Sequence, residues 1–573
     1  MRLRRPRSAA LVACLLGASA LAACTTPLTG AAPPSVSHGR LTVLALGPVD
    51  TWDPQRMSAP QDIAFAGRTF LRTLTAFPSG GDPGSQHKVV GDLATDAGTP
   101  DASMKTWRFT LRHGITWQDG SAITCADVQY GIARSFAAPF STEGLNYPLA
   151  YLDIPRKADG TSTFTGPTDT AGAPAFDKAV ACSGDTVTFH LTTPMTDFNE
   201  ALALPVFAPF KKSQDRGKAG TYAVFASGPY ELKGLWDASS GGTFVRNPRW
   251  DKASDPIRKA QPVAISYVEG TESQAAVQQV IDGRGERAAS VALDSAPPAV
   301  QRHLLSDPAL SNRVLNPDGQ FVDYLAPNLA SGVMKNAEVR TAFALATNKD
   351  DYVTALGGPS VATPTNTLIG PALPGHRSSD PLGAGSSGDA AAARAMLHRS
   401  GLALPVTVRV AYRSTPMADK AMTALSSGWT DVGFHVELQP VAKDYFQTVS
   451  QPGRTAATDV FWANWAPAWP SASTVIPSLF DSRINLTSSG KGLDLGGFQD
   501  AKVNTQITQI LAMRDASAQA NAWADLDASL AKRVAFIGLA QRRAMYVAGS
   551  AVSGLNANEA MGGFVDLATI EVR

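Results

Sequence analysis

Alternating helix and strand patterns between residues 389 and 464 constrain the fold most strongly. Asp389 can cap a helix that stops at Gly401, because aspartate accepts hydrogen bonds from the first turn and glycine adopts the left-handed conformation that ends helices. Apolar spacing predicts further helices over residues 418–432 and around 445–446, and strands over 406–410, 434–438 and 460–464. Strands alternating with helices of this length form a parallel sheet with right-handed crossovers. This half of the chain is therefore expected to be α/β.

The segment from Trp107 to Phe136 carries a second set of local signals. Its first residues alternate apolar and polar side chains over 107–111, which predicts a half-buried strand. Thr124 then stands as a helix N-cap with Asp127 three residues on, a variant of the capping box. Another alternating strand is expected over residues 187–191.

Downstream, Asn336 should cap one helix whose apolar side carries Val339, Phe343, Ala346 and Val353. The Pro- and Gly-rich stretches 357–374 and 380–388 should be loops.

The N-terminus has the pattern of an export signal. Four arginines precede a short apolar stretch over residues 9–20, which is too short to span a bilayer. Leu21-Ala22-Ala23-Cys24 resembles the lipobox of bacterial lipoproteins, which implies cleavage before Cys24 and acylation of its thiol. The alternative is an ordinary secretory signal with a chance cysteine, and Arg4-Arg5 leaves both the general secretory and the twin-arginine routes open. The small, Pro-rich residues 25–39 are expected to form a flexible tether, and the rest of the chain a soluble body outside the cytoplasm, held to the outer face of the cell membrane.

The charge balance disfavours nucleic acid as a partner, and the cysteine content suggests a disulfide. Lys plus Arg number 50 and Asp plus Glu 49, so the charge of the chain does not support nucleic-acid binding. Besides Cys14 and Cys24, the chain holds only Cys125 and Cys182. In an oxidising compartment these two form a natural pair, and the chain-entropy model gives a bridge of this span about 4 kcal/mol of stabilisation. Two buried free thiols are the alternative.

Five stretches along the chain carry a further pattern. They are Trp52-Asp53-Pro54, residues 107–131, Ser227-Gly228-Pro229-Tyr230, Arg246-Asn247-Pro248-Arg249-Trp250 and residues 336–356. Together they resemble the extracellular solute-binding proteins of the peptide/nickel class (family 5), which serve ABC importers. The resemblance implies a periplasmic-binding-protein-like type II fold with two hinged lobes in three parts. Lobe 1 would comprise residues 40–66, 222–318 and 541–573, with 67–221 as an extra subdomain, and lobe 2 residues 319–540, with crossovers near Phe321 and Tyr546 as the hinge.

The resemblance also implies where a ligand binds. In peptide-binding relatives an acidic residue pairs with the ligand's amine, but the matching stretch here runs Trp465-Ala466-Pro467-Ala468-Trp469, with Ala468 in place of the carboxylate. An unpaired buried ammonium costs several kcal/mol, so ordinary zwitterionic peptides are disfavoured unless Asp459 or Asp500 replaces that acid. Trp465 and Trp469 are the favoured ligand contacts, whereas Trp462 should lie in the core because it points to the other side of its strand.

Three further residues are weaker candidates for ligand contact. Tyr324 and Asn328 lie at the expected lobe crossover, where a core tyrosine and a turn asparagine would explain them equally well. Trp52 is the third.

The sequence therefore predicts a monomeric, non-enzymatic binding protein with a small-molecule ligand, an ABC permease and ATPase as partners, and no cofactor. A secreted lipid-anchored hydrolase is the main alternative, but the chain lacks Gly-x-Ser-x-Gly and His-Glu-x-x-His motifs and the Ser-x-x-Lys set with its partner motifs. Its eight histidines are scattered, which disfavours a catalytic metal. A sensor or scaffold that kept the fold without transport is the third hypothesis.

Overall fold

A computed structural model of the chain describes residues 39–486 and 492–573. The predicted export signal, the lipidation site Cys24 and nearly all of the predicted tether lie outside the described residues. Within them, no helix is both long and apolar enough to cross a membrane. The boundaries proposed above for the lobes stay predictions.

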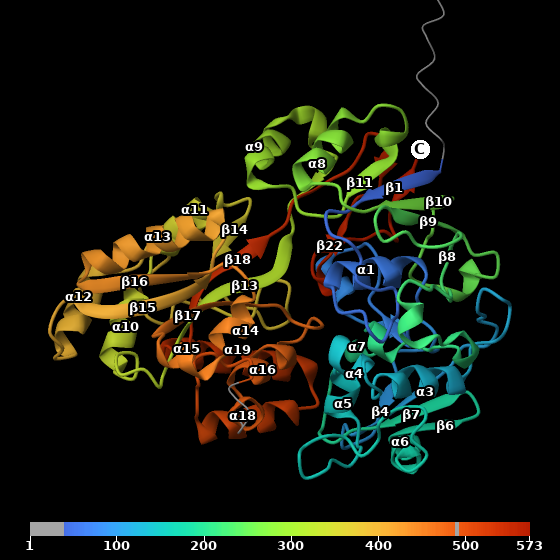
Figure 1. Ribbon diagram of the computed structural model, residues 1–573, viewed down its shortest axis with the longest axis horizontal. Helices are drawn as coiled ribbons and strands as arrows, with labels where there is room; N and C mark the ends of the chain where they lie inside the picture. Colours follow the sequence, from blue (N-terminus) through green and yellow to red (C-terminus); the bar gives the residue numbers. More distant parts are fainter. Residues whose placement is uncertain (1–38, 487–491) are drawn as a thin grey trace, which may run out of the picture. The chain divides into compact units, whose positions relative to one another are not determined.

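A six-stranded mixed sheet carries the C-terminal half (Figure 1). Its strands, in spatial order, are β14 (Ala362–Pro364), β18 (Ile537–Arg543), β13 (Asp318–Pro327), β17 (Val460–Trp465), β15 (Val406–Arg413) and β16 (Phe434–Val441). β15 runs parallel to both β16 and β17. In sequence, α12 (Ala390–Arg399) precedes β15, α13 (Pro416–Asp431) lies between β15 and β16, and α14 (Tyr445–Val449) lies between β16 and β17. The predicted alternation and the parallel pairing are confirmed. β13 and β18 add antiparallel pairs that the local pattern did not predict.

The helix expected from Asn336 onward is in fact two helices, α10 (Ala337–Leu345) and α11 (Lys349–Leu356). Asn336 caps the first, as predicted, through hydrogen bonds from the backbone N–H groups of the first turn. Asn348 then caps the second by accepting a bond from Asp351 N. The prediction of one helix was wrong because the apolar spacing continues past Asn348, although this cap begins a second helix.

A five-stranded sheet joins segments far apart in the N-terminal half. Its order is β11 (Ser290–Ala292), β1 (Arg40–Leu44), β10 (Ala264–Val268), β9 (Gly241–Arg246) and β8 (Tyr230–Leu232). β1 pairs parallel to β10 and β11, whereas β9 is antiparallel to β10. Its core is rich in aromatic rings, with Trp52 packed against Phe65, Phe70, Trp236, Phe244 and Tyr267.

A four-stranded sheet, β4 (Thr99–Pro100), β5 (Thr106–Thr110), β7 (Thr186–His190) and β6 (Val180–Ser183), forms the third unit. The capping box predicted at Thr124 and Asp127 is present and starts α3 (Cys125–Arg134). Cys125 and Cys182 form a disulfide with their Cα atoms 5.9 Å apart, which confirms the predicted pair. The bridge ties the first residue of α3 to β6, a strand that pairs with β7 and was not predicted.

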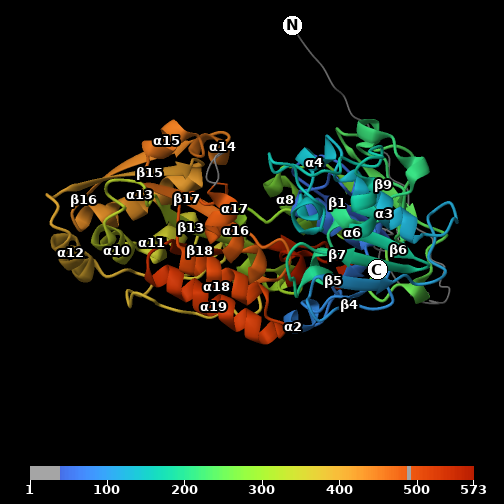
Figure 2. The ribbon, with the colours of Figure 1, turned by 90° about the horizontal axis from the view of Figure 1, so that it is seen from below.

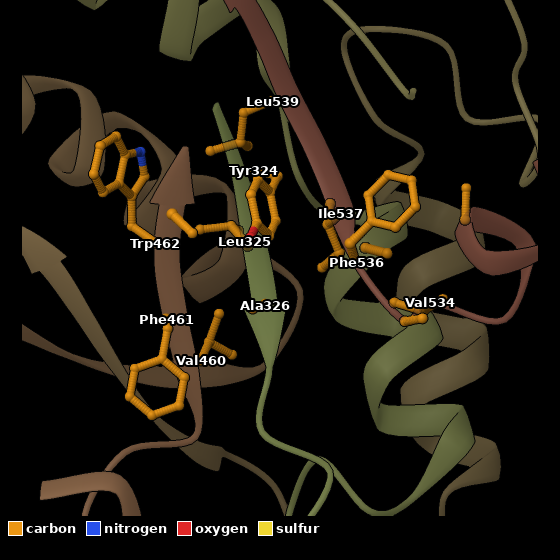
Figure 3. Packing of buried hydrophobic residues seen from close by; sticks show 14 of the residues in the cluster. Tyr324, Leu325, Ala326, Val460, Phe461, Trp462, Val534, Phe536, Ile537 and Leu539 are labelled. Atoms are coloured by element: carbon orange, nitrogen blue, oxygen red, sulfur yellow. The ribbon is translucent and has the colours of Figure 1, made fainter. Parts of the chain in front are cut away.

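Residues from both faces of the six-stranded sheet belong to one large apolar cluster. Figure 3 shows side chains from β13, β17 and the segment leading into β18, with Trp462 and Tyr324 among them. Two helices, α18 (Ala501–Leu511) and α19 (Ala516–Lys532), run side by side near this sheet and bury Ile507, Trp523 and Leu530 (Figure 2). The predicted ligand contacts begin at the end of β17.

Candidate ligand-binding cleft

A cavity of about 240 Å³ opens beside the end of β17. Trp465 and Trp469, the two favoured sequence candidates, both line it. The other walls come from separate parts of the chain, namely residues 58–64, 77, 145–147, 203–204, 318–322, 368–373, 541 and 559–562. The chain thus brings together residues assigned above to lobe 1, its subdomain and lobe 2.

Trp465 is fixed by strand register. It lies opposite Val322 of β13, and both side chains line the cleft. Its indole N–H donates to the carbonyl oxygen of Thr474 at 3.0 Å, which holds the half-buried ring in one orientation. Trp462 lies on the opposite face of β17, is 8% exposed and donates its N–H to the hydroxyl of Tyr352. The prediction that Trp462 belongs to the core is confirmed.

Trp469 is buried more deeply than a tryptophan that offers a whole ring face to a ligand. Only 2% of it is exposed, and its indole N–H donates to Asp197 at 2.9 Å. The rings of Tyr147 and Tyr151 meet it edge-on, with centroids 5.2 and 6.2 Å away. Trp469 therefore lines the cleft with part of a ring whose position is set by contacts with the 147–201 segment.

Ala468 lines the cleft, so the position where the resemblance expects a carboxylate faces the ligand space with a methyl group. Neither proposed substitute lies there. Asp459 is buried and accepts two bonds from the guanidinium of Arg409, at 2.8 and 3.0 Å. Asp500 caps α18 and pairs with Arg533 at 2.6 Å. Both carboxylates are already committed to structural partners.

Two weaker candidates lie outside this cleft. Trp52 is fully buried in the aromatic core beside the five-stranded sheet and does not line the cleft, because its indole packs among other rings. Asn328 is buried at the end of β13, where its side-chain amide donates to the carbonyl oxygens of Thr455 and Thr458. It acts as a loop-fixing asparagine.

Tyr324 lines a neighbouring cavity of about 520 Å³ and not the cleft itself. That cavity shares Trp465 and Ala466 with the cleft and is also lined by Phe321 and Phe446. Burial raises the pKa of the Tyr324 hydroxyl. The ring is 4% exposed, so most of it packs in the core.

Sequence reasoning missed the charged and amide groups of the cleft, Asp318, Gln320, Gln541 and Glu559. Burial, and then the charge of Asp318, raise the pKa of Glu559. No local pattern marks these residues, since they reach the cleft from the start of β13, from β18 and from the short turn 559–561. Among residues 39–486 and 492–573, no group of three or more His, Cys, Asp or Glu side chains could hold a metal ion.

The sequence matches the profile of the bacterial extracellular solute-binding proteins, family 5 (middle region), over residues 88–486. The chain belongs to this family. The oligopeptide-binding protein OppA of Bacillus subtilis is 27% identical over 28% of this chain and 29% of its own length, so that alignment covers less than a third of either protein. Periplasmic OppA of Salmonella typhimurium is 22% identical over 68% of this chain and 69% of its own.

A solved structure extends the comparison to nearly the whole chain. Clavulanic acid biosynthesis oligopeptide binding protein 2 matches with a TM-score of 0.83 at 25% identity, covering 94% of this chain and 96% of its own. The family member described here therefore has the periplasmic-binding-protein-like type II fold that the resemblance implied.

Proposed function

We propose that this family 5 protein is the lipid-anchored, substrate-binding component of an ABC importer. It captures a peptide-like or other small organic solute between its two lobes and delivers it to the membrane permease and its ATPase. The observation that carries the proposal is the cleft at Trp465, whose walls come from both predicted lobes and the subdomain. A solute that touches walls from both lobes favours the closed arrangement, because the empty protein lacks those contacts.

The chemistry of the walls supports a ligand with a substantial apolar surface. Trp465, Leu373, Phe77 and Met561 present apolar surface, which suits a largely dry pocket with a few orienting polar groups. The related proteins are named for oligopeptide binding, which supports a peptide-like solute. Ala468 has only a methyl group where the peptide-binding relatives carry an acidic residue, so an amine of the ligand would not be recognised at that position.

The location follows from the N-terminal sequence. Acylation of Cys24 would hold the protein at the outer face of the membrane, with residues 25–39 as the spacer, and the folded part acting as a monomer. Metabolic labelling with a radioactive fatty acid tests this: Cys24→Ser should abolish the label, and a label that persists would contradict it.

Ligand-dependent stabilisation without turnover tests the binding function. A solute that binds only the native state raises the melting temperature in proportion to the logarithm of its concentration. A hydrolase would consume the stabilising compound, and a sensor or scaffold without a small ligand would show no stabilisation. We expect a stabilising compound to be recovered unchanged, by mass spectrometry, after prolonged incubation.

A further inference from the structure

The charged lining of the cleft is of one sign. Asp318 and Glu559 are its two charged residues, and no Lys, Arg or His is among the described residues that line it. Ser58, Gln320 and Tyr147 also contribute polar groups, but these can both donate and accept hydrogen bonds. The permanent charge in the cleft is therefore negative.

Only one of the two carboxylates has a nearby cation. The Asp318 carboxylate lies 3.4 Å from Nε of Arg543, which is not among the residues that line the cleft. Glu559 forms no ion pair within residues 39–486 and 492–573, and it is half-buried. Burial and the charge of Asp318 raise its pKa, which is the response of a carboxylate that lacks a positive partner.

Gln541 adds an unpartnered acceptor to the same wall. It lies across β13 from Trp465, since Val322 pairs with both residues, so the three side chains share one face and all line the cleft. Its side-chain NH₂ donates to the carbonyl oxygens of Gly319 and Arg542. Its side-chain oxygen is buried with no hydrogen-bond partner in the described part of the chain, and Gln541 is only 3% exposed. A buried acceptor without a donor costs about 1 to 3 kcal/mol, which a donating ligand would recover.

We infer that the cleft is selective for amphipathic cations, with an apolar or aromatic body against Trp465 and a single amine or guanidinium group facing Glu559 and Gln541. A free carboxylate on the ligand finds no basic residue among the described residues of the lining and meets two negative charges. The ligand class is thus an amine, an amidated peptide or another cation without its own acid group. This inference rests on the proposed function, because it assigns the substrate class of the same cleft.

Matched probes test the selectivity. We would measure binding of 3-phenylpropylamine, 3-phenylpropanoate and 2-amino-4-phenylbutanoate at pH 7 by calorimetry, with longer-chain and indole analogues of each. The amines should bind at least about 10-fold more tightly than the carboxylates, with the zwitterions between them, because one charged hydrogen bond contributes on this scale. Carboxylates that bind as tightly as amines would overturn the inference.

Variants separate this inference from the proposed function. Glu559→Gln should weaken amine binding about 10-fold and reduce the preference over the carboxylate, whereas Glu571→Gln, an exposed acid on the nearby C-terminal strand, should change neither. Amine binding unchanged in Glu559→Gln would contradict the inference alone. If no probe bound, the inference alone would be contradicted, because the proposed function allows other small solutes. If Trp465→Ala left the binding of every probe unaltered, the cleft would not be the binding site and the proposed function would fail with it.

Discussion

The indole N–H of Trp469 donates to the carboxylate of Asp197 at 2.9 Å, joining two residues 272 positions apart in the sequence. Ser473 donates its hydroxyl to the same Asp197 oxygen at 2.5 Å. One buried carboxylate therefore holds both the tryptophan and the turn that follows it. This contact connects the wall of the cleft after β17 to the subdomain that carries the disulfide.

A double-mutant cycle measures this connection. Trp469→Phe keeps the ring but removes the donor, and Asp197→Asn weakens the acceptor, so each change should lower the free energy of unfolding by about 1 to 2 kcal/mol. Because the two groups bond to each other, the double variant should lose about 1 kcal/mol less than the sum. Chemical denaturation checks this, and strictly additive losses would show that the bond contributes nothing.

The disulfide should stabilise the subdomain by restricting its unfolded state. Cys125 and Cys182 are separated by 57 positions, for which the chain-entropy model gives about 4 kcal/mol. Cys125→Ser combined with Cys182→Ser should therefore lower the melting temperature and the denaturation midpoint. Alkylation of the denatured wild-type protein without reductant should label neither residue, and labelling of both would refute the bridge.

Asp62 should make stability depend on pH. Burial, followed by the charges of Asp50, Glu269 and Asp294, raises the pKa of this 7%-exposed carboxyl to about 7. The native state holds the proton more tightly than the unfolded state, so the stability that protonation contributes is full below about pH 4 and is lost as the pH rises through 7. The loss is complete at pH 8.5 and amounts to about 4 kcal/mol, because the pKa rises from 3.8 to about 7 and each pKa unit corresponds to about 1.36 kcal/mol.

Asp62→Asn removes that titration. Its melting temperature should exceed that of the wild type at pH 8.5 and differ little from it at pH 4. Asp177→Asn, an exposed helical aspartate, serves as the control and should show no such trend. A difference between Asp62→Asn and the wild type that stays constant with pH would contradict the predicted titration.

The sequence predicts this fold where its signals are local. The caps at Thr124, Asp389 and Asn336 mark helix starts because each bonds within its own first turn. The same apolar spacing wrongly predicted one continuous helix across Asn348, because the apolar periodicity persists although a second helix begins there. Long-range strand pairs such as β13 with β18 leave no local trace in the sequence, so no pattern predicted them.

The candidate site divides in the same way. Trp465 could be predicted because strand alternation separates it from Trp462 within one short segment. Glu559 and Asp318 could not, since they meet only through the fold, 241 positions apart. Trp52 and Asn328 are buried away from the cleft, and a conspicuous residue type does not reveal whether its surroundings are core or cleft.

Native mass spectrometry of the protein purified from its own host tests the central claim most directly, namely that the cleft beside Trp465 holds a small solute. We expect the wild type and the core variant Trp462→Phe to carry the same small-molecule adduct. Trp465→Ala should lose it, because removing an aromatic anchor at a binding site typically costs 2 kcal/mol or more, about 30-fold in affinity. An adduct retained at equal occupancy in Trp465→Ala would contradict the account.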